Sequence, residues 1–272
     1  MKKIIISLIL IFTLSFIFIG CSKSQNSQTN ERKVNPASDF EYTIMGDNDK
    51  YIDIKKYIGN NSNVIIPEEI ENLPVKCIDI AAFENTEIEL VDIPDTVEMI
   101  CHYAFSNCKK LHTVNMGNGV RIVLEGAFKN CANLENLTLS PNISQTESEA
   151  FSNCNSLKEL HIPKGFNDWA PEIFYNNSIT KLTFEDGIEN IGGYATLWNY
   201  EKALKEVTFP ASVKKLGEWT FGDGVEHAYF LGDAPEFGKK PFGESKVTIH
   251  YKNGTKGWDK TGLEEWYTLV EE

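Results

Sequence analysis

The sequence predicts a solenoid, a stack of short coils that each contribute one strand to a parallel sheet. Three observations predict it: a regular phenylalanine period, a repeated block around each phenylalanine, and a short alternating apolar segment that ends each block. The phenylalanines lie about 23 residues apart, or twice that, with Trp198 near the one skipped position, at 83, 105, 128, 151, 174, 221 and 242. A fixed period of this length is typical of stacked supersecondary units.

The best-formed blocks begin at Ala104, Ala127 and Ala150 and read AFSNCKKLHTVNM, AFKNCANLENLTL and AFSNCNSLKELHI. Each ends in an apolar-x-apolar segment, which predicts a short strand with one buried face. In several copies a proline or glycine follows and ends the strand. A second apolar pair then predicts an arc that turns the chain into the next coil, as in Val97/Ile100, Val120/Val123 and Val213/Leu216. Because one strand cannot bury its inner face alone, successive coils must stack, at about 4.8 Å per strand.

The repeated frame Ile-Pro, x-x-Val-x-x-Ile-Gly-x-x-Ala-Phe, x-x-Cys-x-x-Leu resembles the BspA-type leucine-rich repeat of bacterial surface proteins. The resemblance covers roughly residues 39–267 and implies a leucine-rich-repeat-like solenoid of about 23-residue coils. The start, FEYTIMGDNDKYIDIKKYIG, is similar to the family's opening strands and implies a hairpin-like N-terminal cap. The end, YFLGDAPEFGKKPFGESKVTIHYKNGTKGW, resembles its closing cap. We therefore expect one capped solenoid over residues 39–272, with coils that bulge around Trp169 and from Gly192 to Lys202, where the register is lost.

The N-terminus predicts export and lipid anchoring. Lys2 and Lys3 precede an apolar run over residues 4–19, which is the arrangement of a secretory signal. Phe18-Ile19-Gly20-Cys21 resembles a bacterial lipobox, which implies removal of residues 1–20 and lipidation of Cys21. The rest of the segment 21–38 is polar and lacks aromatic residues, as in a disordered tether. The expected location is the cell membrane, where the lipid-anchored protein is exposed outside the cytoplasm.

The charge of the chain disfavours two classes of partner. Removal of Lys2 and Lys3 with the signal changes the net charge from -13 to -15. Phosphate binding requires basic side chains, and no Lys/Arg stripe is present, so nucleic acid is not an expected partner. The same acidity disfavours docking of the domain onto anionic lipid, and it is sufficient to keep an exported protein soluble.

Five cysteines remain after Cys21, and the sequence predicts that they are small buried apolar residues with inert thiols. Three of them occupy one repeat position, and all three point the same way into the coil, which disfavours disulfides between them. A column along a stack is also no tetrahedral metal site. The five are Cys77, Cys101, Cys108, Cys131 and Cys154. A parallel column, Asn107, Asn130, Asn153 and Asn176, is expected to bond the backbone of turns.

No set of residues predicts an enzyme, a cofactor or a metal site. The sequence has no Gly-x-Ser-x-Gly, His-Glu-x-x-His or phosphate-loop motif. Cys101 and His102 are adjacent, but adjacent residues of an extended segment point to opposite sides. The histidines show no metal-ligand spacing, and the segment 47–49 fits a hairpin turn rather than a calcium loop.

The outward face of the predicted sheet is the first candidate binding surface, because side chains alternate along a strand. Extended faces of solenoids commonly bind partners, although any solvated sheet has such a face. The repeat register predicts two outward columns. The first is Asp92, Asn115, Thr138, His161, Thr183 and Thr208, and the second is Thr113, Asn136, Glu159, Lys181 and Glu206.

Aromatic residues where the register is disturbed form a second candidate: Trp169, Tyr175, Tyr194 and Tyr200. Aromatic residues on irregular loops often anchor interfaces. They could equally refill the core, which is the better explanation of Trp198. Trp258, Trp266 and Tyr267 are expected to seal the last coil.

The resulting expectation is a lipid-anchored surface protein that binds a protein or a glycan through its sheet face. By resemblance, adhesion or host contact is the leading role. The alternatives are a structural or envelope-assembly scaffold and an accessory subunit of a surface hydrolase or uptake system. The fold alone does not choose among them, because one fold supports many functions.

Overall fold

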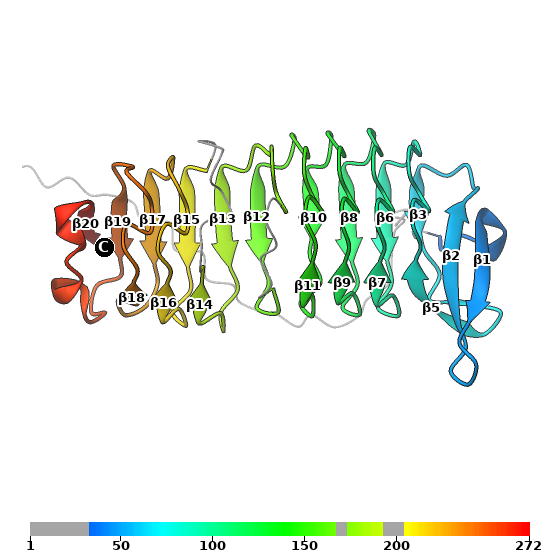
Figure 1. The fold of residues 1–272 in the computed structure, drawn as a ribbon, viewed down its shortest axis with the longest axis horizontal. Coiled ribbons are helices and arrows are strands. Elements are labelled where there is room, and N and C mark those ends of the chain that lie inside the picture. The colour runs from blue at the N-terminus through cyan, green and yellow to red at the C-terminus, as the bar shows by residue number, and fades with distance from the viewer. Residues whose placement is uncertain (1–32, 167–172, 193–203) are drawn as a thin grey trace, which may run out of the picture. The chain divides into compact units, whose positions relative to one another are not determined.

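The computed structural model describes residues 33–166, 173–192 and 204–272. The coils follow one another in a single row along the chain (Figure 1), as the phenylalanine period predicted. Strands dominate these ranges, and the helices are three short 3-10 turns: η1 (Ala37–Asp39), η2 (Trp258–Lys260) and η3 (Leu263–Glu265). No helix in the described ranges is long and apolar enough to cross a membrane.

A hairpin caps the N-terminal end of the stack, as the resemblance implied. Strands β1 (Phe40–Met45) and β2 (Tyr51–Tyr57) pair antiparallel. The segment 47–49 lies in the turn between them, after Gly46, whose φ of 81° suits glycine. The structure is ordered before this hairpin as well. Asn35, which the sequence placed in the tether, is buried, and its Oδ1 accepts a hydrogen bond of 2.9 Å from the backbone N of Ile65.

The first parallel sheet contains the predicted strand of each coil. It divides into two parts, with spatial orders β10-β8-β6-β3 and β12-β13-β15-β17-β19-β20. Inward residues of these strands, such as Val114 and Leu182, are fully buried, and their sequence neighbours face outward. The strands are β3 (Asn63–Ile65), β6 (Leu90–Ile93), β8 (Thr113–Met116), β10 (Asn136–Thr138), β12 (Glu159–Ile162), β13 (Lys181–Phe184), β15 (Glu206–Phe209), β17 (His227–Phe230), β19 (Thr248–Tyr251) and β20 (Thr268–Glu271).

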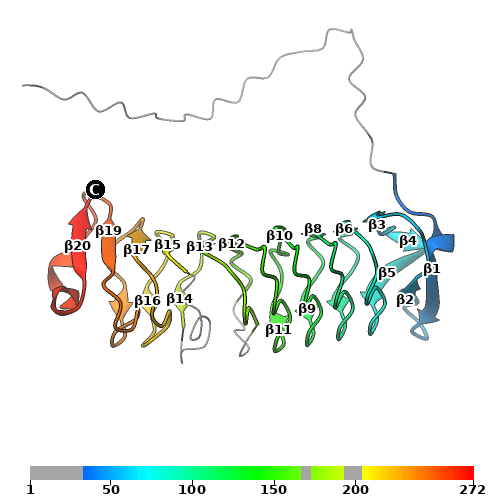
Figure 2. The same ribbon diagram turned by 90° about the horizontal axis from the view of Figure 1, so that it is seen from above.

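A second sheet lies within what the sequence predicted as a turning arc, seen from above in Figure 2. In most coils the arc contains a two-residue strand, and its second residue, such as Ile100, Val123 or Leu216, is fully buried. This sheet also divides into two parts. One has the spatial order β1-β2-β5-β7-β9-β11, in which β4 also pairs with β5, and the other has the order β14-β16-β18. These strands are β4 (Glu69–Ile70), β5 (Leu73–Ile78), β7 (Met99–Ile100), β9 (Ile122–Val123), β11 (Gln145–Thr146), β14 (Asn190–Ile191), β16 (Lys215–Leu216) and β18 (Glu236–Phe237).

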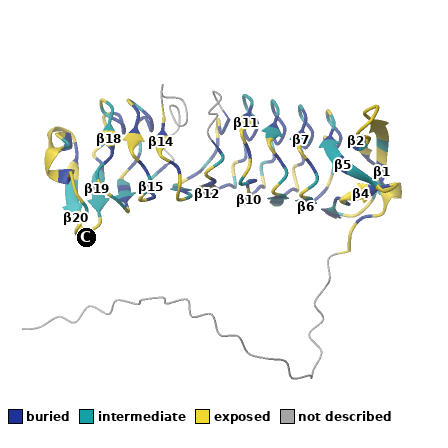
Figure 3. Cartoon of the chain, turned by 90° about the horizontal axis from the view of Figure 1, so that it is seen from below, coloured by how far each residue is buried: buried dark blue, intermediate teal, exposed yellow. Residues whose placement is uncertain are grey.

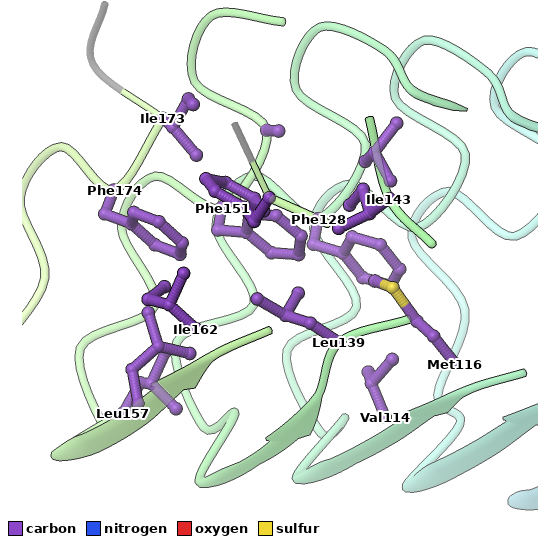
Figure 4. Close-up of a cluster of buried hydrophobic side chains, with 14 of the residues drawn as sticks. Val114, Met116, Phe128, Leu139, Ile143, Phe151, Leu157, Ile162, Ile173 and Phe174 are labelled. Carbon is purple, nitrogen blue, oxygen red and sulfur yellow. The ribbon is translucent and has the colours of Figure 1, made fainter. Parts of the chain in front are cut away.

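The periodic phenylalanines form a column of stacked rings in the core (Figure 4). Ring centroids of Phe83, Phe105, Phe128, Phe151 and Phe174 follow one another at 4.7, 4.9, 5.3 and 5.4 Å, and consecutive planes differ by at most 20°. Offset stacking at such distances adds to the burial of each ring. Figure 3 shows that buried segments recur in every coil along the row. The column explains why the period is so regular.

The asparagine column does more than the sequence predicted. Asn107, Asn130, Asn153 and Asn176 all have φ near +60°, a left-handed conformation that asparagine tolerates better than most residues. Their side chains bond to one another rather than to the turn backbone: the Nδ2 atoms of Asn130, Asn153 and Asn176 each donate to the Oδ1 of the preceding asparagine, at 3.0, 2.8 and 2.5 Å. The expectation of backbone bonds was therefore wrong, because equivalent amides of stacked coils lie within reach of each other.

Aromatic residues close the C-terminal end, as expected for Trp258 and Tyr267. Trp258 is 4% exposed, and its ring stacks on Tyr251 with centroids 4.8 Å apart. The Tyr267 hydroxyl donates to the backbone O of Gly243 at 3.1 Å and accepts from the backbone N of Phe242 at 3.3 Å. Trp266 contributes less, because it stays 39% exposed.

Candidate functional site

The structure places the two predicted columns side by side on the outward face of the first sheet. Parallel pairing sets Asp92 opposite Asn115 and Asn115 opposite Thr138, and it aligns His161, Thr183 and Thr208 in the same way. All of these side chains are exposed or half-buried. The second column is aligned by the same ladders and is also exposed or half-buried: Thr113 and Asn136, then Glu159, Lys181 and Glu206.

Side chains within these columns bond across neighbouring strands. Asn115 Nδ2 donates to Asp92 Oδ1 at 2.6 Å, and His161 Nδ1 lies 2.9 Å from Thr183 Oγ1. Lys181 Nζ lies 3.8 Å from Glu206 Oε2. The two hydrogen bonds restrain the side chains of Asn115 and His161 before any partner arrives, and preorganisation reduces the ordering cost of binding.

Both columns extend further than the sequence reasoning followed them. Tyr229 and His250 continue the first column, and His227 continues the second. His227 Nδ1 lies 3.0 Å from His250 Nε2, and the rings of Tyr229 and His250 stack at 4.5 Å. The signal was present in the sequence, because these residues follow the repeat register. It was missed because the histidines were examined only for metal-ligand spacing.

The sheet is interrupted between β10 and β12. Within the described ranges, β10 pairs only with β8, and β12 pairs only with β13. The core remains continuous across the interruption, because the rings of Phe128 and Phe151 stack at 5.3 Å. Leu137 is only partly buried, whereas its counterparts Val114 and Leu160 are 0% and 3% exposed. The face therefore opens at this position while the stack behind it stays closed.

A hollow of about 290 Å³ occupies the interruption. Leu137 and Leu160 supply its apolar surface, and polar groups surround them: Glu135, Asn136, Thr138, Glu159, His161, Lys181 and Thr183. A neighbouring hollow of about 490 Å³ shares Glu135, Asn136 and Glu159 and continues to the loop before β12, where Asn155, Ser156 and Lys158 complete its lining. Six predicted residues thus meet at one place: Asn136, Thr138, Glu159, His161, Lys181 and Thr183. Hydroxyl, amide, carboxylate, imidazole and ammonium groups there can both donate and accept hydrogen bonds.

The remaining predicted sites are placed less completely. Of the aromatic candidates, only Tyr175 belongs to the described residues, and it is 44% exposed. Trp169, Tyr194 and Tyr200 lie outside the described residues, as do Trp198, Cys21 and most of the tether and the disturbed coils. The structure therefore brings no second aromatic candidate beside Tyr175 in the ranges it describes.

The cysteines separate into two groups. Cys108, Cys131 and Cys154 are fully buried, and each Sγ donates to a phenylalanine carbonyl of the preceding coil, at 3.0, 3.2 and 3.4 Å. Burial raises the pKa of Cys154 to about 12. Cys77 and Cys101 instead lie near the surface beside each other. In the described ranges no three His, Cys, Asp or Glu side chains are arranged to hold a metal ion.

Several solved structures of bacterial leucine-rich repeat proteins are similar to this chain. A leucine-rich repeat protein of T. pallidum is 24% identical over 88% of this chain and 98% of its own, with a TM-score of 0.56. A leucine-rich cell surface protein of Faecalibacterium prausnitzii is 20% identical over 76% and 74%, with a TM-score of 0.47. A leucine-rich repeat protein of Bacteroides ovatus is 19% identical over 88% and 77%, also with a TM-score of 0.47. No curated protein sequence matches the chain.

The family model of the BspA-type leucine-rich repeat region matches the chain in six copies. The matched residues are 76–199 and 174–230, which together cover more than half of the sequence. They include the stacked phenylalanines, the asparagine column and both sides of the sheet interruption. The chain therefore belongs to the BspA-type leucine-rich repeat family, and the resemblance inferred from the repeated frame is confirmed.

Proposed function

We propose that this protein is a bacterial surface binding module, lipid-anchored through Cys21, that binds an extracellular protein or glycan on the outward face of its first sheet. The observation that carries the proposal is the hollow at the β10–β12 interruption, where six outward side chains of the two columns converge. The role is one of binding and adhesion rather than catalysis.

The interruption supports a binding role because it leaves strand groups without pairing. In the rest of the described face, a backbone ladder joins each strand to the next. Unpaired strand edges are a liability that proteins normally cover, bend or charge. Here charged and polar side chains line the opening, and the stacked core holds both sides in place. A rigid polar opening suits one sugar residue or one polar side chain of a larger partner, and neighbouring coils supply contacts on either side.

The proposal is tested with soluble residues 22–272, assayed against an array of matrix proteins, mucins and envelope glycans at physiological salt. The test variant is Glu159→Ala/His161→Ala/Lys181→Ala, which removes three groups of the hollow. We expect the parent protein to bind saturably. In the variant, we expect the Kd to rise by at least tenfold. One good charge-assisted hydrogen bond accounts for about that factor.

A matched control lies on the second sheet, where Gln145, Lys215 and Glu236 are exposed on β11, β16 and β18. Changing these three to alanine also removes one cation, one anion and one neutral polar group, so the net charge is unchanged in both variants. Lys215 and Glu236 lie 3.5 Å apart, much as Lys181 and Glu206 do. Equal loss in both triple variants contradicts a site at the hollow. No binding across the array contradicts an adhesive role and favours an envelope-internal one.

A further inference from the structure

Two cysteine side chains of neighbouring coils meet on the outer side of the second sheet. The Sγ atoms of Cys77, on β5, and Cys101, directly after β7, lie 3.4 Å apart. The residues are not direct partners in the ladder, because Cys77 opposes Met99, so the sulfurs approach each other along a diagonal. To form a bond of about 2.05 Å, the two sulfurs must move more than an ångström closer together.

The surroundings of this pair differ from those of the other three described cysteines. Cys77 is half-buried, so a reagent in solvent can reach its thiol, and Cys101 is buried beside it at 8% exposed. The hydrogen bond with Cys77 lowers the pKa of Cys101, whereas burial and the carboxylates of Asp79 and Asp53 each oppose this shift more strongly than the Lys55 ammonium supports it. The pKa of Cys77 is raised by the same contact and by burial. The pair thus shares its protons, and the loss of the first leaves a thiolate bonded to the remaining thiol.

We propose that Cys77 and Cys101 are an oxidation site that forms a disulfide between the first two coils of the solenoid. The reaction partner is a disulfide-bearing oxidant, either a small molecule or a protein, as found in oxidising compartments outside the cytoplasm. Its occurrence in the cell rests on the exported location proposed above. Its chemistry rests only on the geometry of the two thiols.

The reaction proceeds by two exchanges. The thiolate of one cysteine attacks the disulfide of the oxidant, which gives a mixed disulfide and releases one oxidant thiol. The second cysteine loses its proton and displaces the remaining oxidant sulfur. Two cysteine thiols are oxidised, one external disulfide is reduced to two thiols, and the two protons end on those thiols. The odd number of cysteines after Cys21 is thereby explained as one reactive pair and three buried thiols that bond to phenylalanine carbonyls.

The disulfide would link coils that are otherwise held here by a short strand pairing. Strand β7 has two residues, and its ladder with β5 consists of Cys77 with Met99 and Ile78 with Ile100. A covalent link at this point fixes the N-terminal cap, which pairs with β5 through β2, to the rest of the stack. Cross-links stabilise chiefly by restricting the unfolded chain, so the folded structure need not change.

The experiment uses the full chain with Cys21→Ser, purified reduced in detergent and incubated with oxidised glutathione. Remaining thiols are then alkylated in denaturant and counted by mass spectrometry. The reduced protein has five thiols to alkylate. After oxidation we expect three alkylated thiols, and the protein should have lost two hydrogen atoms. Both cysteines lie between Lys76 and Lys109, so trypsin does not separate them. A protease specific for glutamate cleaves at Glu84 and Glu98 and places them in different peptides, which the disulfide joins.

Variants complete the test. Cys77→Ser and Cys101→Ser each abolish the link and the accompanying rise in Tm, whereas Cys154→Ala retains both. Five alkylated thiols after oxidation, a stable glutathione adduct, or a link between two chains each overturns the proposal. If a serine variant fails to fold, the peptide map of the parent protein still decides the question. Because the assay requires no ligand, its failure is distinguishable from a failure of the proposed binding function.

Discussion

The ring of Tyr57 stacks on the ring of Phe83, with centroids 5.2 Å apart and planes 13° from parallel. The phenylalanine column therefore begins on a tyrosine from the N-terminal hairpin, which covers the first ring. The Tyr57 hydroxyl donates to the backbone O of Asn61 at 2.9 Å and accepts from its backbone N at 3.0 Å. One side chain thus closes the core and fixes the loop that follows β2.

The two roles of Tyr57 can be separated by substitution. We expect Tyr57→Ala to lower the free energy of unfolding by about 3 to 4 kcal/mol, because it removes a buried ring and exposes Phe83. Tyr57→Phe keeps the stack and loses the hydroxyl bonds, at a cost of about 1 kcal/mol. Denaturant titration followed by circular dichroism measures both. Equal effects of the two variants would show that the ring does not act as a cover.

The asparagine column predicts a split between backbone and side-chain effects. Asn130→Gly keeps the left-handed conformation and loses the two amide bonds to Asn107 and Asn153, so we expect a loss of about 1 to 2 kcal/mol. Asn130→Ala loses the same bonds and adds the cost of a left-handed Cβ, a further 1 kcal/mol or so. Thermal unfolding of the two variants tests this order, and an alanine variant as stable as the glycine variant contradicts it.

Lys55 is expected to matter more than an ordinary surface lysine. Its Nζ lies 2.8 Å from Asp53 Oδ2 and also contacts Asp79 Oδ2, and the Asp53 side chain is 9% exposed. Lys55→Met leaves the buried Asp53 carboxylate beside Asp79 without a cation, at a cost of about 2 to 3 kcal/mol. The matched control is Lys76→Met, because the Lys76–Glu98 pair is well exposed and should contribute less than about 1 kcal/mol.

The sign of the pH dependence of Lys55 follows from its partners. Hydrogen bonds with Asp53 and Asp79 raise the pKa of Lys55. A lysine whose charged form is stabilised in the folded state contributes its full stability below the unfolded pKa of about 10.4. This contribution is lost as the pH rises through the folded pKa. The difference in Tm between the parent protein and Lys55→Met should therefore be constant near neutral pH. A difference that disappears between pH 6 and 8 would contradict this origin.

Tyr267 predicts a separate alkaline transition. Burial raises the pKa of Tyr267 to about 12. The unfolded chain loses this proton near pH 10, so between about pH 10 and 12 the unfolded state binds fewer protons and stability falls, by about 2.7 kcal/mol in total. Tyr267→Phe should be less stable at pH 7, through loss of its bonds to Phe242 and Gly243, and should lose less stability over this interval. Denaturant titrations at pH 8, 10 and 11 measure the difference, and parallel curves for the two proteins contradict it.

Features that arise from equivalent positions in successive coils could be predicted from the sequence. The phenylalanine column, the strand of each coil and the two outward columns follow from residues about 23 positions apart, whereas the two caps were implied by the family resemblance. The second strand was missed because two-residue strands such as β9 are too short for an alternating pattern.

Contacts along diagonals were not predicted. Cys77 meets Cys101 although it opposes Met99, and His227 meets His250 although it opposes Thr248. A comparison of equivalent positions examines only residues directly opposite each other, whereas long side chains also reach diagonal neighbours. The interruption at β10 is missed for a related reason. Pairing depends on the fit between two coils, and the blocks from Ala127 and Ala150 have the same apolar pattern.

The direction of the asparagine ladder makes whole coils interchangeable. Asn130 donates to the coil before it and accepts from the coil after it, and Asn107 ends the row by donating to Ser106 Oγ at 3.1 Å. Excision of residues 107–129 would join Ser106 to Asn130 and restore an intact block, AFSNCANL, with Asn130 in the place of Asn107. The molecule can thus be shortened or lengthened in steps of one strand spacing, about 4.8 Å, without any new kind of contact. How far a solenoid of this design extends is therefore set by the number of copies it contains, independently of the chemistry that each copy displays.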